Sequence, residues 1–398
     1  MSWEKKTLDQ LGSISRGKSK HRPRNDPKLF GGQYPFIQTA DVKNENFYIT
    51  EYSDTYNEAG LAQSKLWDVG TLCITIAANI ADTGILGIPA CFPDSVMGFI
   101  PYDGISDVRF IKYCFDLLQR DCKQISQGTA QDNLSWQKLS TIEFPAPPIE
   151  TQHRIANILS AYDDLIENNR KQIKLLEEAA QRLYKEWFVN LRFPGYEHTK
   201  ITDGVPEGWE KSTVATVSSI LRRGISPRYN ENGKFVVINQ KCIRQTVVSF
   251  DESRQQEKPY PEDLNLQDSD TVICSTGAGT LGRVGQIFGN YPDTTLDSHV
   301  TLVRAKEGFG KQYLFQSLNS RQTYLMGMGK GSTNQLELNR GTIQDLDIYI
   351  PSKKVLNQFE QVAQPIHDKI SVISKCIMQL QTARDCLLPK LMSGKVEV

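Results

Sequence analysis

The sequence lacks the patterns that identify metal sites, redox centres and membrane spans. Its eight cysteines stand at least eight residues apart, so no Cys-x-x-Cys pair occurs, and the five histidines are equally scattered. Zinc ligation and thiol redox chemistry need closely spaced ligands, so we expect no metal site. No apolar run of about 18 residues is present to span a bilayer. The opening MSWEKKTLDQ has no apolar signal core, and isolated thiols fit a reducing compartment, which predicts a cytoplasmic protein.

A net charge is missing as well. Lys+Arg and Asp+Glu both count 46, so the formal net charge is zero. This balance excludes a uniformly basic coat for nucleic acid but leaves room for a local basic patch. With 398 residues, of which 39% are hydrophobic, the chain is long enough for two or three domains with real cores.

Short motifs recur in the same order at an offset of 201 to 207 residues, which predicts an internal repeat. The matched segments are Trp3-Glu4-Lys5 with Trp209-Glu210-Lys211, Arg16-Gly17 with Arg223-Gly224, 36–42 with 237–243, 71–76 with 272–277, GTAQ at 128–131 with GSTN at 331–334, and Pro148 with Pro351.

The repeat predicts an α+β chain in which two mixed α/β domains alternate with two long helices. Prolines and the stretch Gly204-Val205-Pro206-Glu207-Gly208 separate these parts. The predicted boundaries are 1–148 and 193–351 for the domains, and 149–192 and 352–398 for the helices.

Within the domains, β-branched and aromatic runs predict strands, and apolar spacing predicts short helices. The predicted strands cover 34–42, 71–76, 235–243 and 271–276, and the predicted short helices cover 105–120 and 311–325.

The first long helix has apolar residues at alternating spacings of four and three, a repeat of 3.5 residues that favours a coiled coil. Charged residues occupy most other positions, and Asn169 is the single polar residue of the seam, a position that often fixes register. The seam comprises Ile155, Leu159, Tyr162, Ile166, Asn169, Ile173, Leu176, Ala180, Leu183 and Trp187.

The second long helix repeats this seam 204 residues later, with Arg384 as its one polar position. Pro365 is expected to kink this helix or delay its start. Connectivity favours antiparallel pairing of the two helices, whereas the alternative is that each packs only on its own domain. The second seam comprises Phe359, Ala363, Ile366, Ile370, Ile373, Ile377, Leu380, Arg384, Leu387 and Leu391.

Two short motifs resemble catalytic patterns without their context. Gly277 to Gly282 fits G-x-G-x-x-G, but the following residues predict a turn and a strand, whereas a dinucleotide site needs a helix there. Asp297-Ser298-His299 lacks a nucleophile elbow, so a structural role is favoured. No P-loop, H-E-x-x-H or EF-hand pattern occurs, and no catalytic residues are predicted.

Basic residues cluster at matching places in the two copies. In the first copy, Asp26 is the one acidic residue within the basic stretch. Matching basic loops suggest an anionic partner, and DNA is the obvious one. The alternative is that the loop is simply solvated. The candidate DNA-binding residues are Arg16, Lys18, Lys20, Arg22 and Arg24, with Lys28 nearby, in the first copy, and Arg222, Arg223, Arg228, Lys330 and Asn334 in the second.

Several segments resemble the specificity subunit of type I restriction-modification systems. They are FPAPPIETQHRIANILSAYDDLIENNRKQIKLLEEAAQRLYKEWF at 144–188, VPEGW at 205–209, TGAGTLGRVGQIF at 276–288, GSTNQLELNRGTIQDLDIYIP at 331–351 and LLPKLMSGKVEV at 387–398. The sequence departs from the family at 353–359, where KKVLNQF replaces the usual junction seen at 148–155. This departure bears on where the second helix starts rather than on its identity.

The resemblance implies two target-recognition domains that each bind half of a bipartite, asymmetric double-stranded DNA site. It further implies that the helices set the spacing and dock two methyltransferase subunits, which restriction subunits join. S-adenosylmethionine, ATP and Mg²⁺ would belong to those partners, so this chain would hold no cofactor and would not be an enzyme. It also implies adenine methylation and restriction of DNA by the whole complex.

The spacing of the seam agrees with this function. The 33 residues from Ile155 to Trp187 span roughly 50 Å, whereas one DNA turn is about 34–36 Å. Two alternatives remain at this point: a coiled-coil scaffold that binds only proteins, and a nucleotide-binding enzyme built on Gly277 to Gly282.

Overall fold

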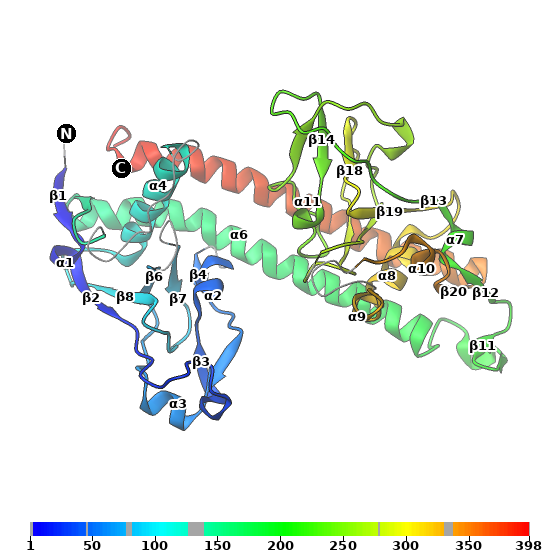
Figure 1. Cartoon of the computed structure of the whole chain (residues 1–398), viewed down its shortest axis with the longest axis horizontal. Helices are drawn as coiled ribbons and strands as arrows, with labels where there is room; N and C mark the ends of the chain where they lie inside the picture. The colour runs from blue at the N-terminus through cyan, green and yellow to red at the C-terminus, as the bar shows by residue number, and fades with distance from the viewer. Residues whose placement is uncertain are drawn as a thin grey trace. The chain divides into compact units, whose positions relative to one another are not determined.

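The computed structural model describes residues 3–44, 47–76, 82–125, 139–277, 279–329 and 337–397. The chain divides into two compact units, unit 1 with residues 1–168 and 377–398, and unit 2 with residues 169–376. Two long helices, α6 (Ile149–Tyr184) and α11 (Lys353–Met392), contribute residues to both units (Figure 1). Within the described ranges, no helix is long and apolar enough to cross a membrane.

Unit 1 is built on a five-stranded sheet with the order β2-β8-β6-β7-β4. Its central strand β6 is buried on both faces, as its apolar sequence LCIT requires, and helix α4 contacts β7. The strands are β1 Glu4–Thr7, β2 Gly12–Arg16, β3 Phe30–Phe36, β4 Tyr48–Ile49, β5 Asp54–Tyr56, β6 Leu72–Thr75, β7 Thr83–Leu86, β8 Val96–Pro101 and β9 Glu143–Ala146. The helices are α1 Leu8–Leu11, α2 Thr39–Asn44, α3 Glu58–Ala62 and α4 Val108–Ile125, with a 3-10 turn η1 at Pro27–Leu29.

Unit 2 is built on a four-stranded sheet with the order β13-β19-β16-β17 and a three-stranded sheet β15-β14-β18. The strands are β10 Ile201–Thr202, β11 Val205–Pro206, β12 Glu210–Thr213, β13 Ser218–Arg223, β14 Phe235–Ile238, β15 Arg254–Gln256, β16 Thr271–Cys274, β17 Val284–Gln286, β18 Thr294–Leu296, β19 Val300–Ala305 and β20 Asp347–Ile350. The helical segments are η2 Lys185–Val189, η3 Tyr196–His198, α7 Val214–Val217, η4 Gln240–Cys242, η5 Glu262–Leu264, α8 Lys311–Asn319, α9 Gln322–Gly327 and α10 Arg340–Gln344.

The predicted repeat and fold class are confirmed by the strand order. The order β2-β8-β6-β7 in unit 1 matches β13-β19-β16-β17 in unit 2, and the pair β1-β9 matches β12-β20. Both units therefore contain the same antiparallel framework of mixed strands and helices. The two copies differ in the further strands and helices that each unit adds to this framework.

Two predicted strands end earlier than expected. The run 34–42 is a strand only to Phe36 and continues as α2, and the run 235–243 is a strand only to Ile238 and continues as η4. Polar side chains turn the backbone at both places: Asp41 accepts from the Gln38 amide at 2.7 Å, and Asn239 accepts from the Lys241 amide at 2.8 Å. Local side-chain hydrogen bonds of this kind compete with strand pairing.

The predicted helix at 311–325 is also divided. Helix α8 ends at Asn319, and α9 begins at Gln322.

The expected delay of the second long helix at Pro365 is wrong. Helix α11 begins at Lys353, twelve residues before this proline, and includes it. Pro365 and Gln361 are both exposed, so water can satisfy the carbonyl of Gln361 that proline leaves without a donor. The unusual junction sequence at 353–359 therefore forms the first turns of the helix.

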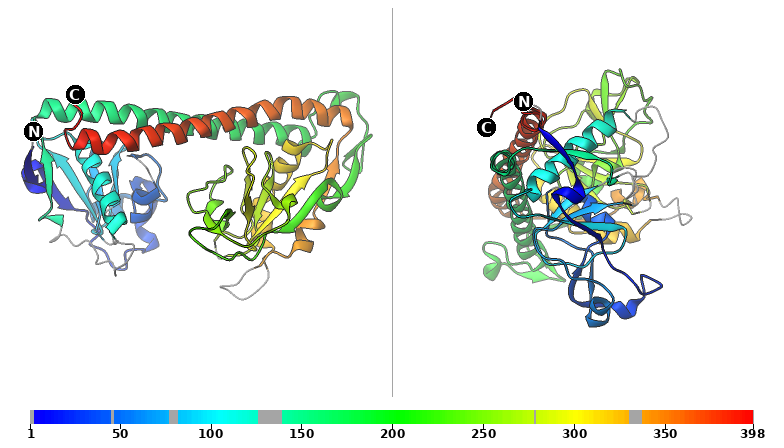
Figure 2. Two further views of the ribbon diagram at one scale, coloured as in Figure 1. Left: turned by 90° about the horizontal axis from the view of Figure 1, so that it is seen from above. Right: turned by 90° about the vertical axis from the view of Figure 1, so that its left-hand side faces the viewer.

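The two long helices pair in antiparallel directions within each unit. In unit 1, Ile155 and Leu159 at the start of α6 share a buried cluster with Leu388 and Leu391 at the end of α11, and Figure 2 shows these helix ends side by side. In unit 2, Phe188 after the end of α6 contacts Phe359 at the start of α11, with ring centroids 5.0 Å apart. All twenty positions of the two predicted seams, Asn169 and Arg384 included, are buried or half-buried.

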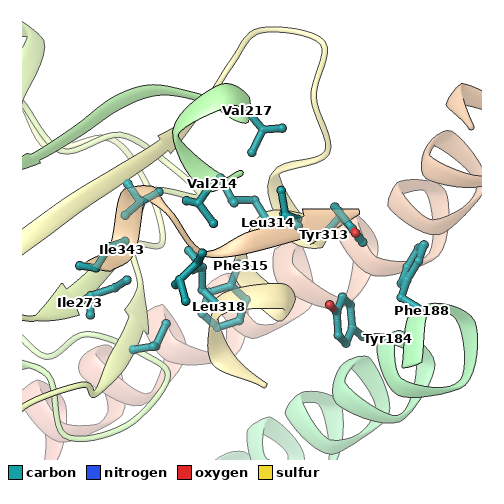
Figure 3. Packing of buried hydrophobic residues seen from close by; sticks show 14 of the residues in the cluster. Tyr184, Phe188, Val214, Val217, Ile273, Tyr313, Leu314, Phe315, Leu318 and Ile343 are labelled. Carbon is teal, nitrogen blue, oxygen red and sulfur yellow. The ribbon is translucent and has the colours of Figure 1, made fainter. Parts of the chain in front are cut away.

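The core of unit 2 joins its globular part to the helices. Figure 3 shows Tyr184 and Phe188 facing Tyr313 of α8, and the ring centroids of Phe188 and Tyr313 lie 4.6 Å apart. Tyr313 is 2% exposed, and burial of such a large aromatic side chain stabilises this junction. The globular part of this unit is thus packed on the helices through aromatic side chains.

Candidate DNA interface

The basic loop of unit 1 leaves the sheet at the end of β2 and covers residues 17–26. The candidates Arg16, Lys18, Lys20, Arg22 and Arg24 are all exposed, as is Lys28 on η1. The loop is anchored on the segment around α3. The Ser64 hydroxyl donates to the Lys18 carbonyl at 2.8 Å, and the His21 amide donates to Gln63 Oε1 at 3.0 Å.

Carboxylates neutralise part of this loop. Asp26 accepts from the Lys28 amide at 3.1 Å and lies 2.9 Å from His21 Nε2, and these bonds lower the pKa of Asp26 below its usual value. Asp94, which lies far away in sequence, contacts Arg24 at 2.6 Å and Arg22 at 3.6 Å. Asp26 is the one acid within this stretch of sequence, and the fold adds Asp94 from a distant segment.

Three basic side chains at this loop, Arg16 at the end of β2 and Lys18 and Lys20 beyond it, are exposed and have no acidic partner among the described residues. These three side chains are the part of the loop that is free to contact phosphate groups.

The repeated Arg-Gly pair has a structural cause. A Cβ atom at Gly17 would lie 2.3 Å from the Phe92 carbonyl oxygen, and one at Gly224 would lie 2.0 Å from that of Leu296. The Gly17 amide donates to the Val96 carbonyl at 2.9 Å, and the Gly224 amide donates to that of Val300 at 3.0 Å. Only glycine allows this close backbone approach, so the loops of both copies leave their sheets at the same place.

The basic candidates of unit 2 are paired with acids. Arg223 contacts Glu337 at 2.5 Å and donates to the Leu338 carbonyl at 2.9 Å, which ties β13 to the segment before α10. Arg222 lies 3.8 Å from Asp263, and Arg228 lies 3.5 Å from Glu257. Lys330 and Asn334, together with the GTAQ and GSTN motifs, lie outside the described residues.

Sequence reasoning missed an exposed arginine in unit 2. The guanidinium carbon of Arg254, on β15, lies 3.6 Å from the centre of the Tyr229 ring. The two residues stand 25 positions apart, and only the fold of the loop onto β15 brings them together. No sequence pattern marks this contact.

The glycine motif at 277–282 forms the connection between β16 and β17. Gly277, Gly279 and Gly282 have positive φ angles of 103°, 78° and 77°, which glycine adopts without strain. The chain continues into strand β17, so no helix N-terminus follows the motif in the described residues. A dinucleotide site is therefore not supported, and the predicted turn is confirmed.

The Asp297-Ser298-His299 segment is a backbone turn. Asp297 is buried and accepts from the His299 amide at 2.9 Å, and burial raises the pKa of this carboxyl. The His299 ring lies 2.7 Å from the Thr276 hydroxyl. The described residues contain no group of three or more His, Cys, Asp or Glu that suits a metal ion.

Two copies of one strand framework, each with arginines at the end of the matching strand, define a protein with two related modules. Residues 1–178 and 206–379 match the family model for the type I restriction modification DNA specificity domain. The chain belongs to this family, and the resemblance seen in the sequence is confirmed.

Relatives match along nearly their whole length. The type I restriction enzyme MjaIX specificity subunit of Methanocaldococcus jannaschii is 27% identical over 412 aligned residues, which cover 100% of this chain and 94% of that protein. The HindI specificity subunit of Haemophilus influenzae is 23% identical, with 97% and 98% covered. The crystal structure of an S subunit from M. genitalium is 17% identical and superimposes with a TM-score of 0.56 over 98% of this chain and 96% of that one, which confirms the fold.

Proposed function

We propose that this chain is the subunit that selects the DNA sequence for a type I restriction-modification complex, and that each unit binds one half of a bipartite site. The observation that carries the proposal is the duplication: the family match covers both copies, and both contain the same strand framework. A protein with two such modules has the form that a two-part recognition site needs.

The two half-sites should differ in sequence. The matching loops carry unlike contacts: Arg16, Lys18 and Lys20 of unit 1 make no ion pair with a described residue, whereas Arg222, Arg223 and Arg228 of unit 2 contact acids. Because base recognition depends on side-chain geometry, unlike loops bind unlike bases. This supports an asymmetric site.

The helix pair serves as the spacer and as the docking surface for two methyltransferase subunits, which restriction subunits join. Apolar side chains outside the seams support docking: Leu165 is 52% exposed, Leu175 65%, Val372 60% and Met378 64%. In a coiled coil without partners such positions are normally polar. A coiled-coil scaffold that binds only proteins would use the same surface but would not select DNA.

The chain itself performs no catalysis in this proposal. S-adenosylmethionine, ATP and Mg²⁺ act in the partner subunits, and the chain works in the cytoplasm with the DNA. The purified chain should therefore show no methyltransferase, nuclease or ATPase turnover until the partners are added.

The test is to sequence methylated adenines across the genome of cells that carry the methyltransferase subunits, with and without this gene. We expect one bipartite motif that depends on the gene. Replacing residues 1–150 with the first domain of another family member should change one half of the motif and keep the other. A methylation pattern that is the same with and without the gene would favour the scaffold, and a swap that changes both halves would contradict separate modules.

A further inference from the structure

Tyr229 and Arg254 of unit 2 form an exposed stacked pair. The guanidinium carbon of Arg254 lies 3.6 Å from the ring centre, within the range of a cation–π contact. Tyr229 is 40% exposed, and Arg254 is exposed as well. Arg254 therefore lies over the Tyr229 ring and remains exposed to solvent.

The backbone holds both partners in place. The Asn230 amide donates to the Gln255 carbonyl at 3.2 Å, the Glu257 amide donates to the Arg228 carbonyl at 3.0 Å, and Tyr229 forms a bridge with Gln256. The loop therefore lies along β15 and is joined to it by these backbone contacts. Ordering of this kind lowers the entropy that an arginine loses when it binds.

Arg254 has no carboxylate partner within the part of unit 2 that the structure describes. Three acids lie within three positions of Arg254 in sequence. Glu252 lies 3.6 Å from Arg244, Glu257 lies 3.5 Å from Arg228, and Asp251 accepts from the Ser249 hydroxyl at 2.8 Å. A fixed, exposed guanidinium without a counter-ion is therefore available to an external acceptor.

The matching position in unit 1 has the opposite charge. Asp54 stands opposite Phe36 in the β3-β5 pair, as Arg254 stands opposite Val237 in the β14-β15 pair, and Phe36 and Val237 are matched by the repeat. Asp54 accepts from Gln38 Nε2 at 2.6 Å. The two copies thus place unlike polar groups at one position of a shared framework. A position that selects different bases in the two half-sites needs such a difference.

We propose that Arg254 contacts the major-groove edge of a guanine in the half-site of unit 2, and that Tyr229 is its positioning residue. This inference rests on the proposed function. Arginine forms two parallel hydrogen bonds to guanine O6 and N7, the commonest specific contact to a base. The edge of a stacked guanidinium presents the donors in the geometry that this contact needs.

The experiment uses the full chain in complex with its methyltransferase subunits, on DNA with each position of the wild-type motif varied. The domain swap of residues 1–150 first assigns one half-site to unit 2. Arg254→Lys keeps the charge and the attraction to the ring but removes the fork. We expect it to lower discrimination at one G·C position of that half-site by roughly tenfold to a hundredfold, with the other half-site unchanged.

Two further variants separate positioning from packing. Tyr229→Phe keeps the ring and should keep the specificity, whereas Tyr229→Leu should relax the same position as Arg254→Lys does. Arg244→Lys is the matched control, because Arg244 is exposed in the same unit but paired with Glu252, and its motif should be that of the wild type.

Several results would overturn the proposal. If the half-site that unit 2 binds contains no G·C pair, there is no guanine for Arg254 to contact and the proposal fails. If Arg254→Lys lowers methylation uniformly and keeps the motif, Arg254 contacts a phosphate group. If the complex with this variant methylates DNA as the wild type does, Arg254 has no role in DNA binding. If the wild-type motif itself does not depend on this chain, the proposed function fails, and that result appears before any variant is made.

Discussion

At the scale of single residues, the repeat is most visible where glycine is irreplaceable. Gly17 lies against the Phe92 carbonyl and Gly224 against that of Leu296, and both glycines adopt ordinary φ angles. The sequence match of Arg16-Gly17 with Arg223-Gly224 therefore reports a packing constraint. The arginines beside these glycines have different surroundings, since Arg16 makes no ion pair with a described residue, whereas Arg223 contacts Glu337.

Gly224→Ala should destabilise unit 2, because its Cβ would lie 2.0 Å from the Leu296 carbonyl oxygen. Overpacking against backbone costs about 1–3 kcal/mol, so the melting temperature should fall by several degrees. Gly327→Ala is the control, since nothing lies within 4 Å of its Cβ position and its φ is not positive. Equal melting temperatures for the two variants would contradict the close approach.

Glu177 predicts a pH dependence of stability in unit 2. Burial raises its pKa to about 7, and a hydrogen bond with Thr246 only partly opposes this. The folded state therefore retains a proton that the unfolded chain loses above its usual pKa of 4.5. Stability falls as the pH rises from about 4.5 to about 7, and the penalty is full above that range.

Glu177→Gln removes this penalty. Because the side chain is half-buried, we expect about 1–2 kcal/mol of added stability at pH 8 and almost none near pH 4.5. Comparing the variant with the wild type at each pH cancels the contributions of all other groups. Denaturant unfolding at several pH values measures the difference, and a constant difference across that range would exclude Glu177 as its source.

At the scale of elements, a buried ion pair joins the two long helices of unit 1. Arg384 of α11 contacts Asp163 of α6, and the Tyr113 hydroxyl of α4 donates to the same carboxylate at 2.5 Å. Asp163 is 2% exposed, and burial raises its pKa despite the arginine. The repeat places Ala180 of α6 where α11 has Arg384, and Arg384 is the cation that Asp163 contacts across the helix pair.

Arg384→Leu should therefore destabilise unit 1 strongly, by about 3–5 kcal/mol, because it leaves a buried carboxylate without its partner. Adding Asp163→Asn should restore most of the loss, since the amide oxygen still accepts from Tyr113 and carries no charge. Unfolding of the single and double variants forms a double-mutant cycle. Additive effects in that cycle would show that the pair does not act as a unit.

Much of the element order was predictable, and its failures have local causes. The 3.5-residue repeat identified both long helices because a seam of about ten positions outweighs any single residue. The strand limits at Phe36 and Ile238 were missed because Asp41 and Asn239 turn the chain through single hydrogen bonds. Pro365 was misjudged because its solvent exposure, which makes it tolerable, is a tertiary property.

The candidate interface was less predictable. Charge clustering located the loop of unit 1, but Asp94 is brought to Arg22 and Arg24 only by folding. The same is true of Tyr229 beneath Arg254. Composition shows where cations are concentrated, whereas which of them remain unpaired depends on contacts between distant segments.

At the scale of the whole molecule, the two units should contribute differently to the salt dependence of DNA binding. Replacing Arg16, Lys18 and Lys20 with Gln should weaken binding by the complex at all sequences. It should reduce the slope of log affinity against log salt by about 0.9 for each phosphate group that the protein no longer neutralises. Arg222→Gln with Arg228→Gln is the matched change in unit 2, where acids already neutralise both side chains, so the slope should change little. Equal slope changes in the two variants would contradict the assignment.

The last prediction concerns the helix pair as a spacer. Seven residues inserted after Leu176 and seven near Ser371, at the facing part of α11, preserve the seam because seven residues are its repeat. Both helices become longer by about 10 Å, which equals roughly three base pairs of DNA. The bases of both half-sites should stay the same while the unspecified gap between them grows. Three base pairs also rotate the DNA by about a third of a turn, and a heptad rotates the helices little, so the complex must absorb this angle. Sequencing the methylated motif of the double-insertion variant gives the answer: an active variant with an unchanged gap would show that the helices do not set the spacing.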